Sequence, residues 1–300
     1  MLSKILYPLY VADSAMLPYA HILAEFTHCL YVTQDKPVFC DEPNNHNLST
    51  DPAICYKGCA YLQLAKDGLY IISRQFNPTH IREIYSVLAK RQPQLHKDLL
   101  IQALKISSKK NVQVWDLTAG FGVDAGLIAS SDCYVTMVEK NPILATILYH
   151  ALDQGYLPKA NLQLVFGDSM AFLQEHRLHS KAHNDDFEIQ YNQVVPNIIY
   201  VDPMFNDKKN AKSKKSMQLI EMLCMDEISA SSEGISTEMP QSNMVDESVE
   251  LFNLAVSTAR DKVVVKRDNK QPSLVVAPKP SYGVQGKTIR YDVYITNNRM

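Results

Sequence analysis

Three acidic residues each come directly after an apolar run that is typical of a buried parallel strand. They are Asp116, Glu139 and Asp168. Because the carboxyl ends of neighbouring parallel strands lie about 5 Å apart, the three side chains can line one cleft. Each acid taken singly is also explained as a solvated strand end or a helix cap. Their shared register favours a ligand site at one edge of a sheet.

Two glycines, Gly120 and Gly122, follow Asp116 between an expected strand at Val112–Trp115 and the expected opening of a helix at Ala125–Ser131. Glycine is needed where the backbone takes a positive φ or must contact a ligand closely. In open α/β sheets such a turn lies outside the carboxyl ends of the strands, where small ligands bind. The spacing alone is weak evidence, and its weight comes from the acids that follow in register.

Glu139 suits the two hydroxyl groups of a ribose, because an acid at the end of the second strand accepts them in dinucleotide sites. Hydrogen bonds to a charged acceptor contribute about 1.5–3 kcal/mol each, which is enough to fix the position of a nucleoside. Asp168 and Ser169 can then contact an adenine amino group and the neighbouring ring edge. The acids therefore predict a ligand that carries a nucleoside.

A fourth apolar run ends in the motif Asp202-Pro203-Met204-Phe205. Proline locks the backbone after the acid, so that the Asp202 carboxylate and a backbone carbonyl can point at an exocyclic amine while Phe205 stacks on the attached ring. Stacking of a base on an aromatic side chain is worth about 1–3 kcal/mol. The alternative is a strand that terminates at proline and a core phenylalanine, and the motif alone does not decide between the two.

A lysine-rich stretch, Asn206–Ser216, follows this motif directly. Its lysines are Lys208, Lys209, Lys212, Lys214 and Lys215. Lysine runs are usually solvated, but here a nucleic-acid backbone would pass, so phosphate contact is the favoured interpretation. Lys266 and Arg267 at the end of the fifth expected strand would add cations to the same rim, although they fit ordinary exposed residues equally well. From Ser216 to Ala259 the chain has no lysine or arginine.

The composition sets limits on the kind of protein. The 300 residues carry a formal net charge of −2, so any basic surface must be local. No apolar run approaches the roughly 18 residues of a membrane span, and an ordinary first strand explains the start better than a signal peptide. We expect a cytoplasmic protein with no membrane partner.

Two groups of residues resemble metal ligands. Cys55 and Cys59 lack a second pair or a histidine set, so reduced thiols are the better interpretation. His176, His179 and His183 share one helical face in the polar tract His176–Gln193. Metal ligation by these histidines is conceivable, but a solvated loop is favoured, and no metal site is predicted.

The order of elements predicts an α/β fold: a Rossmann-like, seven-stranded, mainly parallel sheet with an antiparallel C-terminal edge, plus a small N-terminal α+β module. Strands and helices alternate from Asn111, and two strands, Leu274–Ala277 and Thr288–Thr296, follow without a helix between them. Ala60–Leu64 and Gly68–Ser73 predict a hairpin. We expect the α+β module at residues 1–77, a helical connector at 78–110 and the main domain at 111–300.

Five segments together resemble a known family. Asp116–Asp124, Glu139–Pro142, Asp202–Phe205, Val263–Arg267 and Arg290–Tyr294, in this order and spacing, are similar to class I S-adenosylmethionine-dependent methyltransferases. More narrowly they resemble the ribosomal RNA small-subunit methyltransferase J family, which methylates the N2 amine of a guanine in 16S rRNA. The similarity covers about residues 98–295. It implies S-adenosylmethionine as cofactor and small-subunit ribosomal RNA or the 30S subunit as partner.

Carried over by position, the resemblance implies cofactor contacts at a set of strand-end residues. These are Val123, Asp124, Glu139, Lys140, Asp168, Ser169 and Asp202. The family usually has arginine where this chain has Val123, so a backbone contact alone can survive there. The family's glycine-rich basic stretch corresponds here to Lys90–Asp98, which has no glycine.

The resulting hypothesis is direct methyl transfer to an exocyclic amine. Asp202 and the carbonyl of Pro203 would accept the hydrogens of the amine as positive charge develops on its nitrogen. One alternative keeps the cofactor but takes a DNA base amine or a protein glutamine as acceptor; another is an inactive RNA-binding relative. A nicotinamide dehydrogenase is disfavoured, because the turn lacks the third glycine of that fingerprint.

Overall fold

The computed structural model describes residues 6–39, 55–56, 58–106, 111–181, 195–203, 215, 218–223, 241–296 and 298. The chain forms two compact units. The N-terminal unit comprises Met1–Ser86, Asn141–Tyr156 and Lys209–Glu238, and the large unit comprises Val87–Lys140, Leu157–Lys208 and Met239–Met300. The domain boundaries expected at residues 77 and 110 stay predictions.

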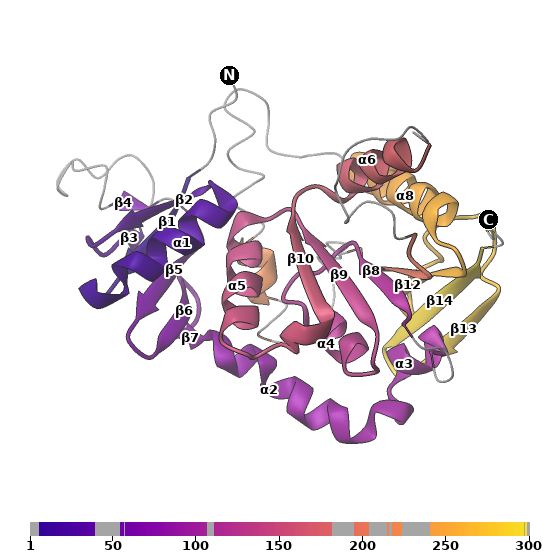
Figure 1. The fold of residues 1–300 in the computed structure, drawn as a ribbon, viewed down its shortest axis with the longest axis horizontal. Coiled ribbons are helices and arrows are strands. Elements are labelled where there is room, and N and C mark those ends of the chain that lie inside the picture. The colour runs from indigo at the N-terminus through magenta and orange to yellow at the C-terminus, as the bar shows by residue number, and fades with distance from the viewer. Residues whose placement is uncertain are drawn as a thin grey trace. The chain divides into compact units, whose positions relative to one another are not determined.

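A seven-stranded sheet forms the centre of the large unit (Figure 1), with the strand order β10-β9-β8-β11-β12-β14-β13. The strands are β8 (Gln113–Asp116), β9 (Tyr134–Glu139), β10 (Leu162–Phe166), β11 (Ile198–Val201), β12 (Lys262–Asp268), β13 (Tyr282–Gln285) and β14 (Ile289–Ile295). The first five in the order run parallel, and β14 pairs antiparallel with both β12 and β13. The predicted fold class is confirmed.

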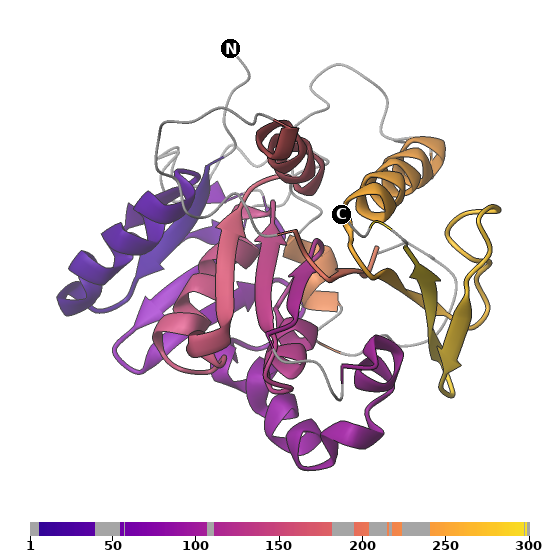
Figure 2. The same cartoon turned by 45° about the vertical axis from the view of Figure 1, so that its right-hand side comes forward.

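One predicted strand is wrong. The segment Leu274–Ala277 is not a strand, and the edge strand beside β14 is instead β13 (Tyr282–Gln285), at the yellow end of the sheet in Figure 2. Leu274 and Val275 are buried because they pack on the core as a loop, while Val276 is 96% exposed. Prolines at 272, 278 and 280 flank the segment, and proline cannot donate to a strand ladder. The sequence of a short apolar run does not show whether it is a strand or another buried segment unless its pairing partner is known.

Helices of the large unit pack on the sheet. They are α3 (Leu99–Leu104), α4 (Val123–Ala129), α6 (Ser169–Lys181) and α8 (Gln241–Thr258), and short 3₁₀ turns lie at Gln92–Lys97 and Lys159–Asn161. Leu173 of α6 and Phe252 of α8 join Trp115 and Val265 in one apolar cluster on a single face of the sheet. This cluster anchors the strands whose ends carry the predicted acids.

The solvated loop expected from His176 is wrong for its first residues. His176 lies in α6 and is buried, with its ring 4.7 Å from that of Trp115 in an edge-on arrangement. The remainder of that tract, residues 182–194, lies outside the described residues. Among the residues that are described, no group of histidine, cysteine or acidic side chains could hold a metal ion.

The N-terminal unit has its own five-stranded sheet, in the order β2-β1-β5-β6-β7. The strands of this sheet are β1 (Tyr7–Val11), β2 (Leu30–Thr33), β5 (Ala60–Ala65), β6 (Gly68–Ser73) and β7 (Thr79–His80). The unit also contains the helices α1 (Leu17–Thr27) and α5 (Pro142–Asp153) and a 3₁₀ turn at Ser14–Met16. A separate pair of short strands is formed by β3 (Val38–Phe39) and β4 (Cys55–Tyr56). The predicted β5–β6 hairpin is confirmed. Helix α2 (Ile81–Arg91) continues from this unit into the large one. None of the described helices is long and apolar enough to cross a membrane.

Candidate functional site

The glycine turn after β8 has the backbone that its sequence predicts. Gly120 and Gly122 have φ values of 56° and 69°, in the left-handed region that side chains disfavour. The N–H group of Gly122 donates to the carbonyl of Ala119 at 2.7 Å, which closes the turn. Gly122 is also the N-cap of α4, so the helix begins at Val123, two residues before the predicted opening.

Glu139 lies beside this turn. It ends β9, is 8% exposed, and its Oε2 atom accepts the N–H group of Gly120 at 2.8 Å. The acid at the second strand end is therefore tied to the glycine turn at the first. Lys140, the next residue, is exposed.

Asp168 and Ser169 lie at the start of α6, after β10. The Oδ1 atom of Asp168 accepts the N–H groups of Met170 and Ala171 at 2.9 and 3.0 Å, the bonds of a helix cap. The hydroxyl of Ser169 donates to the carbonyl of Leu117 at 2.5 Å, which connects α6 to the loop after β8. The capping role that the sequence allowed for Asp168 is present, and it fixes the residue at the same edge as Glu139.

Asp116 is the most buried of the predicted acids, with 1% of the residue exposed. Its Oδ1 atom accepts the N–H group of Thr118 at 3.1 Å. Burial raises the pKa of Asp116 to about 8; the Thr118 bond opposes this rise, and the nearby carboxylates of Asp124 and Asp202 add to it. This carboxyl group is therefore mostly protonated at neutral pH.

The Asp202 corner adjoins the glycine turn. Strand β11 pairs directly with β8, and the N–H group of Asp202 donates to the hydroxyl oxygen of Thr118 at 2.7 Å. Thr118 lies two residues before Gly120, so one hydroxyl joins the two predicted halves of the site. Pro203 is partly buried next to Asp202. Phe205 lies outside the described residues.

A cation bridges two carboxylates at this corner. The ammonium group of Lys266 lies 2.7 Å from Oδ2 of Asp202 and 2.9 Å from Oδ2 of Asp124. The hydroxyl of Tyr200 donates to the same Asp124 oxygen at 2.8 Å, and Arg91 donates to its other oxygen at 3.1 Å. We call Lys266, Asp124, Asp202, Tyr200 and Arg91 the acid–lysine network.

The network shifts the pKa values of its members. Burial alone would raise the pKa of Asp124, but Lys266 and Arg91 hold it below its ordinary value. For Asp202 burial prevails over Lys266, and its pKa is raised. Burial opposes the charge of Lys266, yet the two carboxylates raise its pKa well above the ordinary value. Asp124 and Lys266 thus form an ion pair, whereas burial works against the anion of Asp202.

Comparison with known proteins identifies the family. A family model described as "Putative SAM-dependent methyltransferase" matches residues 74–233 and 243–296. A ribosomal RNA small subunit methyltransferase J of Legionella pneumophila (strain Paris) is 31% identical over 211 residues, which cover 69% of this chain and 72% of the relative. The chain belongs to this family of S-adenosylmethionine-dependent methyltransferases.

A further relative shares the name, and a solved structure shares the fold. A protein of the same name from Marinobacter nauticus is 33% identical over 184 residues, 61% of this chain and 56% of the relative. The crystal structure of a SAM-dependent methyltransferase from Neisseria gonorrhoeae matches with a TM-score of 0.61 at 20% identity, covering 98% of this chain and 97% of the other. The structural match supports the fold, and S-adenosylmethionine is the cofactor of the family.

The cations that the sequence assigned to RNA have different environments in this methyltransferase. Neighbouring residues of a strand point to opposite faces, so Lys266 and Arg267 do not share a rim. Arg267 is 6% exposed and donates twice to the carbonyl of Pro272. Lys215 is exposed, with its ammonium group 6.0 Å from the ring centroid of Phe76. Lys208, Lys209, Lys212 and Lys214 lie outside the described residues.

Sequence reasoning missed three residues of the candidate site. Thr118 lies inside the Asp116–Asp124 segment but was given no role there, and Tyr200 belongs to no motif; their contacts follow from the pairing of β8 with β11. Arg91 lies in the stretch that lacks the family glycines, and it also forms a two-pronged ion pair with Asp98 at 2.9 and 3.1 Å. A conspicuous signal was available for Arg91 alone, as a basic residue in a stretch that the resemblance aligns with a basic motif.

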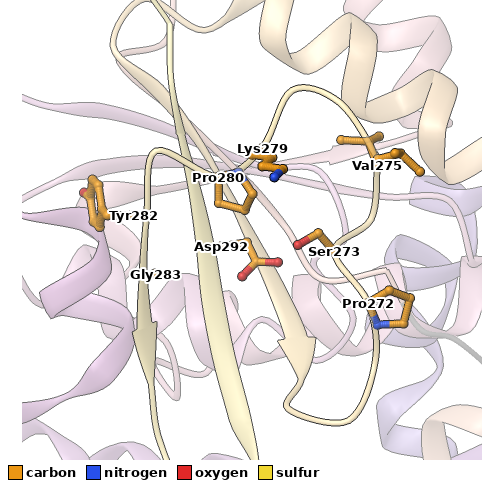
Figure 3. A pocket seen from close by; sticks show the side chains of 9 residues that line it. Pro272, Ser273, Val275, Lys279, Pro280, Tyr282, Gly283 and Asp292 are labelled. Carbon is orange, nitrogen blue, oxygen red and sulfur yellow. The ribbon is translucent and has the colours of Figure 1, made fainter.

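A hollow of about 540 Å³ lies elsewhere in the methyltransferase, beside the loop that follows β12 (Figure 3). Its lining includes Ser273, Lys279, Tyr282 and Asp292. Asp292 pairs with Val265, the strand neighbour of Lys266, and therefore points to the face opposite Lys266. The hollow is separate from the acid–lysine network and contains none of the predicted site residues.

Proposed function

We propose that this methyltransferase transfers a methyl group from S-adenosylmethionine to the exocyclic N2 amine of a guanosine in small-subunit (16S) ribosomal RNA. The relatives named ribosomal RNA small subunit methyltransferase J support the class of substrate. The observation that carries the amine chemistry is the Thr118 bond to the N–H group of Asp202, which brings the Asp202–Pro203 corner next to the glycine turn. Such a protein acts where ribosomes are assembled, in the cytoplasm.

The edge of the sheet has the chemistry that the cofactor needs. Glycines with positive φ permit close approach of a ligand to the backbone, and the acid at the end of β9 is tied to that turn. In this proposal Glu139 accepts the ribose hydroxyls, and Asp168 and Ser169 contact the adenine. The remaining cofactor-binding positions are Asp116, Gly120, Gly122, Val123, Asp124, Lys140 and Asp202. S-Adenosylmethionine supplies an electrophilic methyl group on a sulfonium.

The acceptor corner then performs the amine chemistry. The lone pair of an aromatic exocyclic amine is delocalised into the ring, so the nitrogen is a poor nucleophile. The Asp202 carboxylate and the Pro203 carbonyl accept the hydrogens of the amine and stabilise the positive charge that develops on it. Fixing the amine in line with the methyl group contributes about 7–11 kcal/mol of the reduction in barrier. Phe205 stacks on the guanine, which must be unpaired and unstacked to reach it.

The RNA backbone is bound by cations next to this corner. The lysine-rich stretch 206–216 begins four residues after Asp202, so its charges follow directly on the residue that contacts the base. Phosphate contacts position RNA without reading its sequence. The proposal therefore expects affinity for rRNA that falls steeply with salt concentration.

The test is a methyl-transfer assay with several acceptors in parallel. Tritium transfer from S-adenosylmethionine is measured on 30S subunits, free 16S rRNA, DNA and total protein, and the labelled nucleoside is identified by mass spectrometry. We expect N2-methylguanosine in 16S rRNA, free or in the subunit. Label in DNA or in a glutamine amide would replace the proposed acceptor. Cofactor binding without transfer to any of the four would indicate an inactive RNA-binding relative.

A further inference from the structure

Lys266 is not an exposed surface cation. It lies in β12, its side chain is 23% exposed, and its ammonium group is within 3 Å of two carboxylates. An ammonium group with two carboxylate partners has little charge left for an RNA phosphate. Its role has to be sought in what it does to Asp124 and Asp202.

Asp124 is a rigid anchor for Lys266. Both of its oxygens are bonded, Oδ1 to Arg91 and Oδ2 to Tyr200 as well as to Lys266. Tyr200 is fully buried, and Arg91 is held in turn by the two-pronged pair with Asp98. An ion pair supported by hydrogen bonds on both oxygens keeps its geometry better than an isolated surface pair. Asp124 therefore fixes Lys266 independently of Asp202.

Two polar groups of Asp202 are bonded within the protein, and a third is available to a ligand. Its N–H group bonds Thr118, and its Oδ2 bonds Lys266. Among the described residues, Oδ1 of Asp202 has no hydrogen-bond partner. The carboxylate thus has one oxygen fixed by the protein and one left for a substrate hydrogen.

The charges that act on Asp202 come from α4 and β12. Asp124 on α4 disfavours its anion, whereas Lys266 and Arg267 on β12 favour it. Asp116 on β8 and Tyr200 on β11 have raised pKa values, so both are mostly neutral near pH 7. Tyr291 on β14 is the cross-strand neighbour of Lys266, and Asp202 contributes to the raised pKa of its phenol. Of the cations, Lys266 alone is bonded to Asp202 in the described structure. The anionic form of Asp202 depends mainly on this one amine.

We propose that Lys266 is a positioning residue for the acceptor corner: it bridges Asp202 to Asp124, keeps Asp202 anionic, and turns Oδ1 toward the amine. This inference rests on the proposed function and deepens it. It replaces phosphate contact, one of the two roles that the sequence left open for Lys266. Lysine chemistry suits the task, because a compact ammonium group can serve two carboxylates at once.

The test compares Lys266→Met and Lys266→Arg with Lys270→Met, an exposed lysine in the turn after β12 that serves as the matched control. Steady-state methylation of 16S rRNA is measured from pH 5.5 to 9. For Lys266→Met we expect kcat at pH 7 to fall about 100-fold, because loss of the cation leaves Asp202 both more protonated and without the bridge that orients its Oδ1. The acidic limb of the pH dependence should move up by one unit or more, so that part of the activity returns at high pH. Lys266→Arg should restore most of kcat, and Lys270→Met should match the wild type.

Two outcomes would overturn the inference. If Lys266→Met raised KM for rRNA and reduced the salt dependence of binding while kcat stayed intact, Lys266 would be a phosphate contact. If kcat fell with the pH dependence unchanged in both variants, the role would be structural. Circular dichroism and thermal unfolding establish that each variant is folded.

A second measurement separates this inference from the proposed function. ¹³C NMR of labelled aspartate carboxyl groups, assigned with Asp202→Asn, follows the titration of Asp202 in the free protein without any RNA. We expect the pKa of Asp202 to be higher in Lys266→Met than in the wild type and nearly unchanged in Lys266→Arg. If wild-type protein methylated no rRNA while this shift was present, the proposed function would fail and the positioning role would stand. An unshifted titration with active wild-type enzyme would refute the positioning role alone.

Discussion

The acids along one edge of the large sheet have two kinds of partner. At the ends of β9 and β10, Glu139 accepts a backbone N–H group of the glycine turn, and Asp168 accepts two at the start of α6. After β8 and β11, Asp124 and Asp202 instead share the ammonium group of Lys266. The first group holds backbone turns in place, whereas in the second one cation bridges two carboxylates. In the proposed function the first group forms the cofactor side of the edge, and the second forms the acceptor side, where Asp124 and Asp202 also border the cofactor.

Asp202→Ala should give the largest effect and separates the two sides most clearly. It removes the acceptor of the amine hydrogens, so kcat is expected to fall by at least about 10³-fold. Cofactor affinity, measured by calorimetry, should stay within about tenfold of wild type. Glu250→Ala, at an exposed position of α8, is the control. Full methylation activity in Asp202→Ala would refute the assignment.

Asp116→Asn tests the electrostatics of the acceptor side through stability. The folded-state pKa of Asp116, about 8, lies above the unfolded value near 4, so its stabilising contribution is complete below about pH 4 and is lost as the pH rises toward 8. The slope is about 1.4 kcal/mol per pH unit. Asparagine keeps the Thr118 bond but does not titrate. Between pH 5 and pH 7 the free energy of unfolding of the variant, measured with urea, should therefore rise by about 2–3 kcal/mol relative to that of the wild type. A difference that stays constant over this range would mean that Asp116 is ionised throughout.

Glu139→Ala addresses the cofactor side. Loss of a charged acceptor for the ribose hydroxyls should weaken S-adenosylmethionine binding by about 10- to 100-fold, with kcat at saturating cofactor little changed. Glu139→Gln keeps an oxygen for the Gly120 N–H group and should lose less affinity. Calorimetry and kinetics measure both variants. A variant with normal affinity and a lost kcat would place Glu139 in the chemical step and erase the distinction between the two sides.

Arg91→Met should give the smallest change. Arg91 is partly exposed, with 27% of its side chain accessible, so solvent screens its pairs with Asp98 and Asp124. Removing it should lower the free energy of unfolding by about 1 kcal/mol, while Lys266 and Tyr200 continue to hold Asp124. Urea unfolding measures the effect, and Arg260→Met, at an exposed position, serves as control. A loss of kcat as large as that expected for Lys266→Met would extend the positioning role to Arg91.

The sequence predicted the backbone of the site well because local rules determine it. Gly120 and Gly122 take the positive φ that their spacing indicated, and Asp116, Glu139 and Asp202 follow neighbouring strands as their apolar runs required. We could predict that these acids lie at one edge of the sheet, because parallel strands end on the same side. These inferences needed no knowledge of distant partners.

The partners of those acids could not be predicted, because they come from distant parts of the chain. Asp124 meets Arg91 and Lys266 across 33 and 142 residues, and no spacing rule connects such positions. The same limitation explains the two errors. His176 is buried because Trp115 packs on it, and Leu274–Ala277 is a loop because β14 pairs with a later segment.

Mass mapping of 16S rRNA in vivo tests the central claim most directly. The gene is deleted and then restored either as wild type or as Asp202→Ala. We predict that one N2-methylguanosine disappears on deletion, returns with the wild type and stays absent with the variant. An unchanged rRNA after deletion, or full restoration by Asp202→Ala, would contradict an amine-methylating site built on the Asp202 corner and the glycine turn.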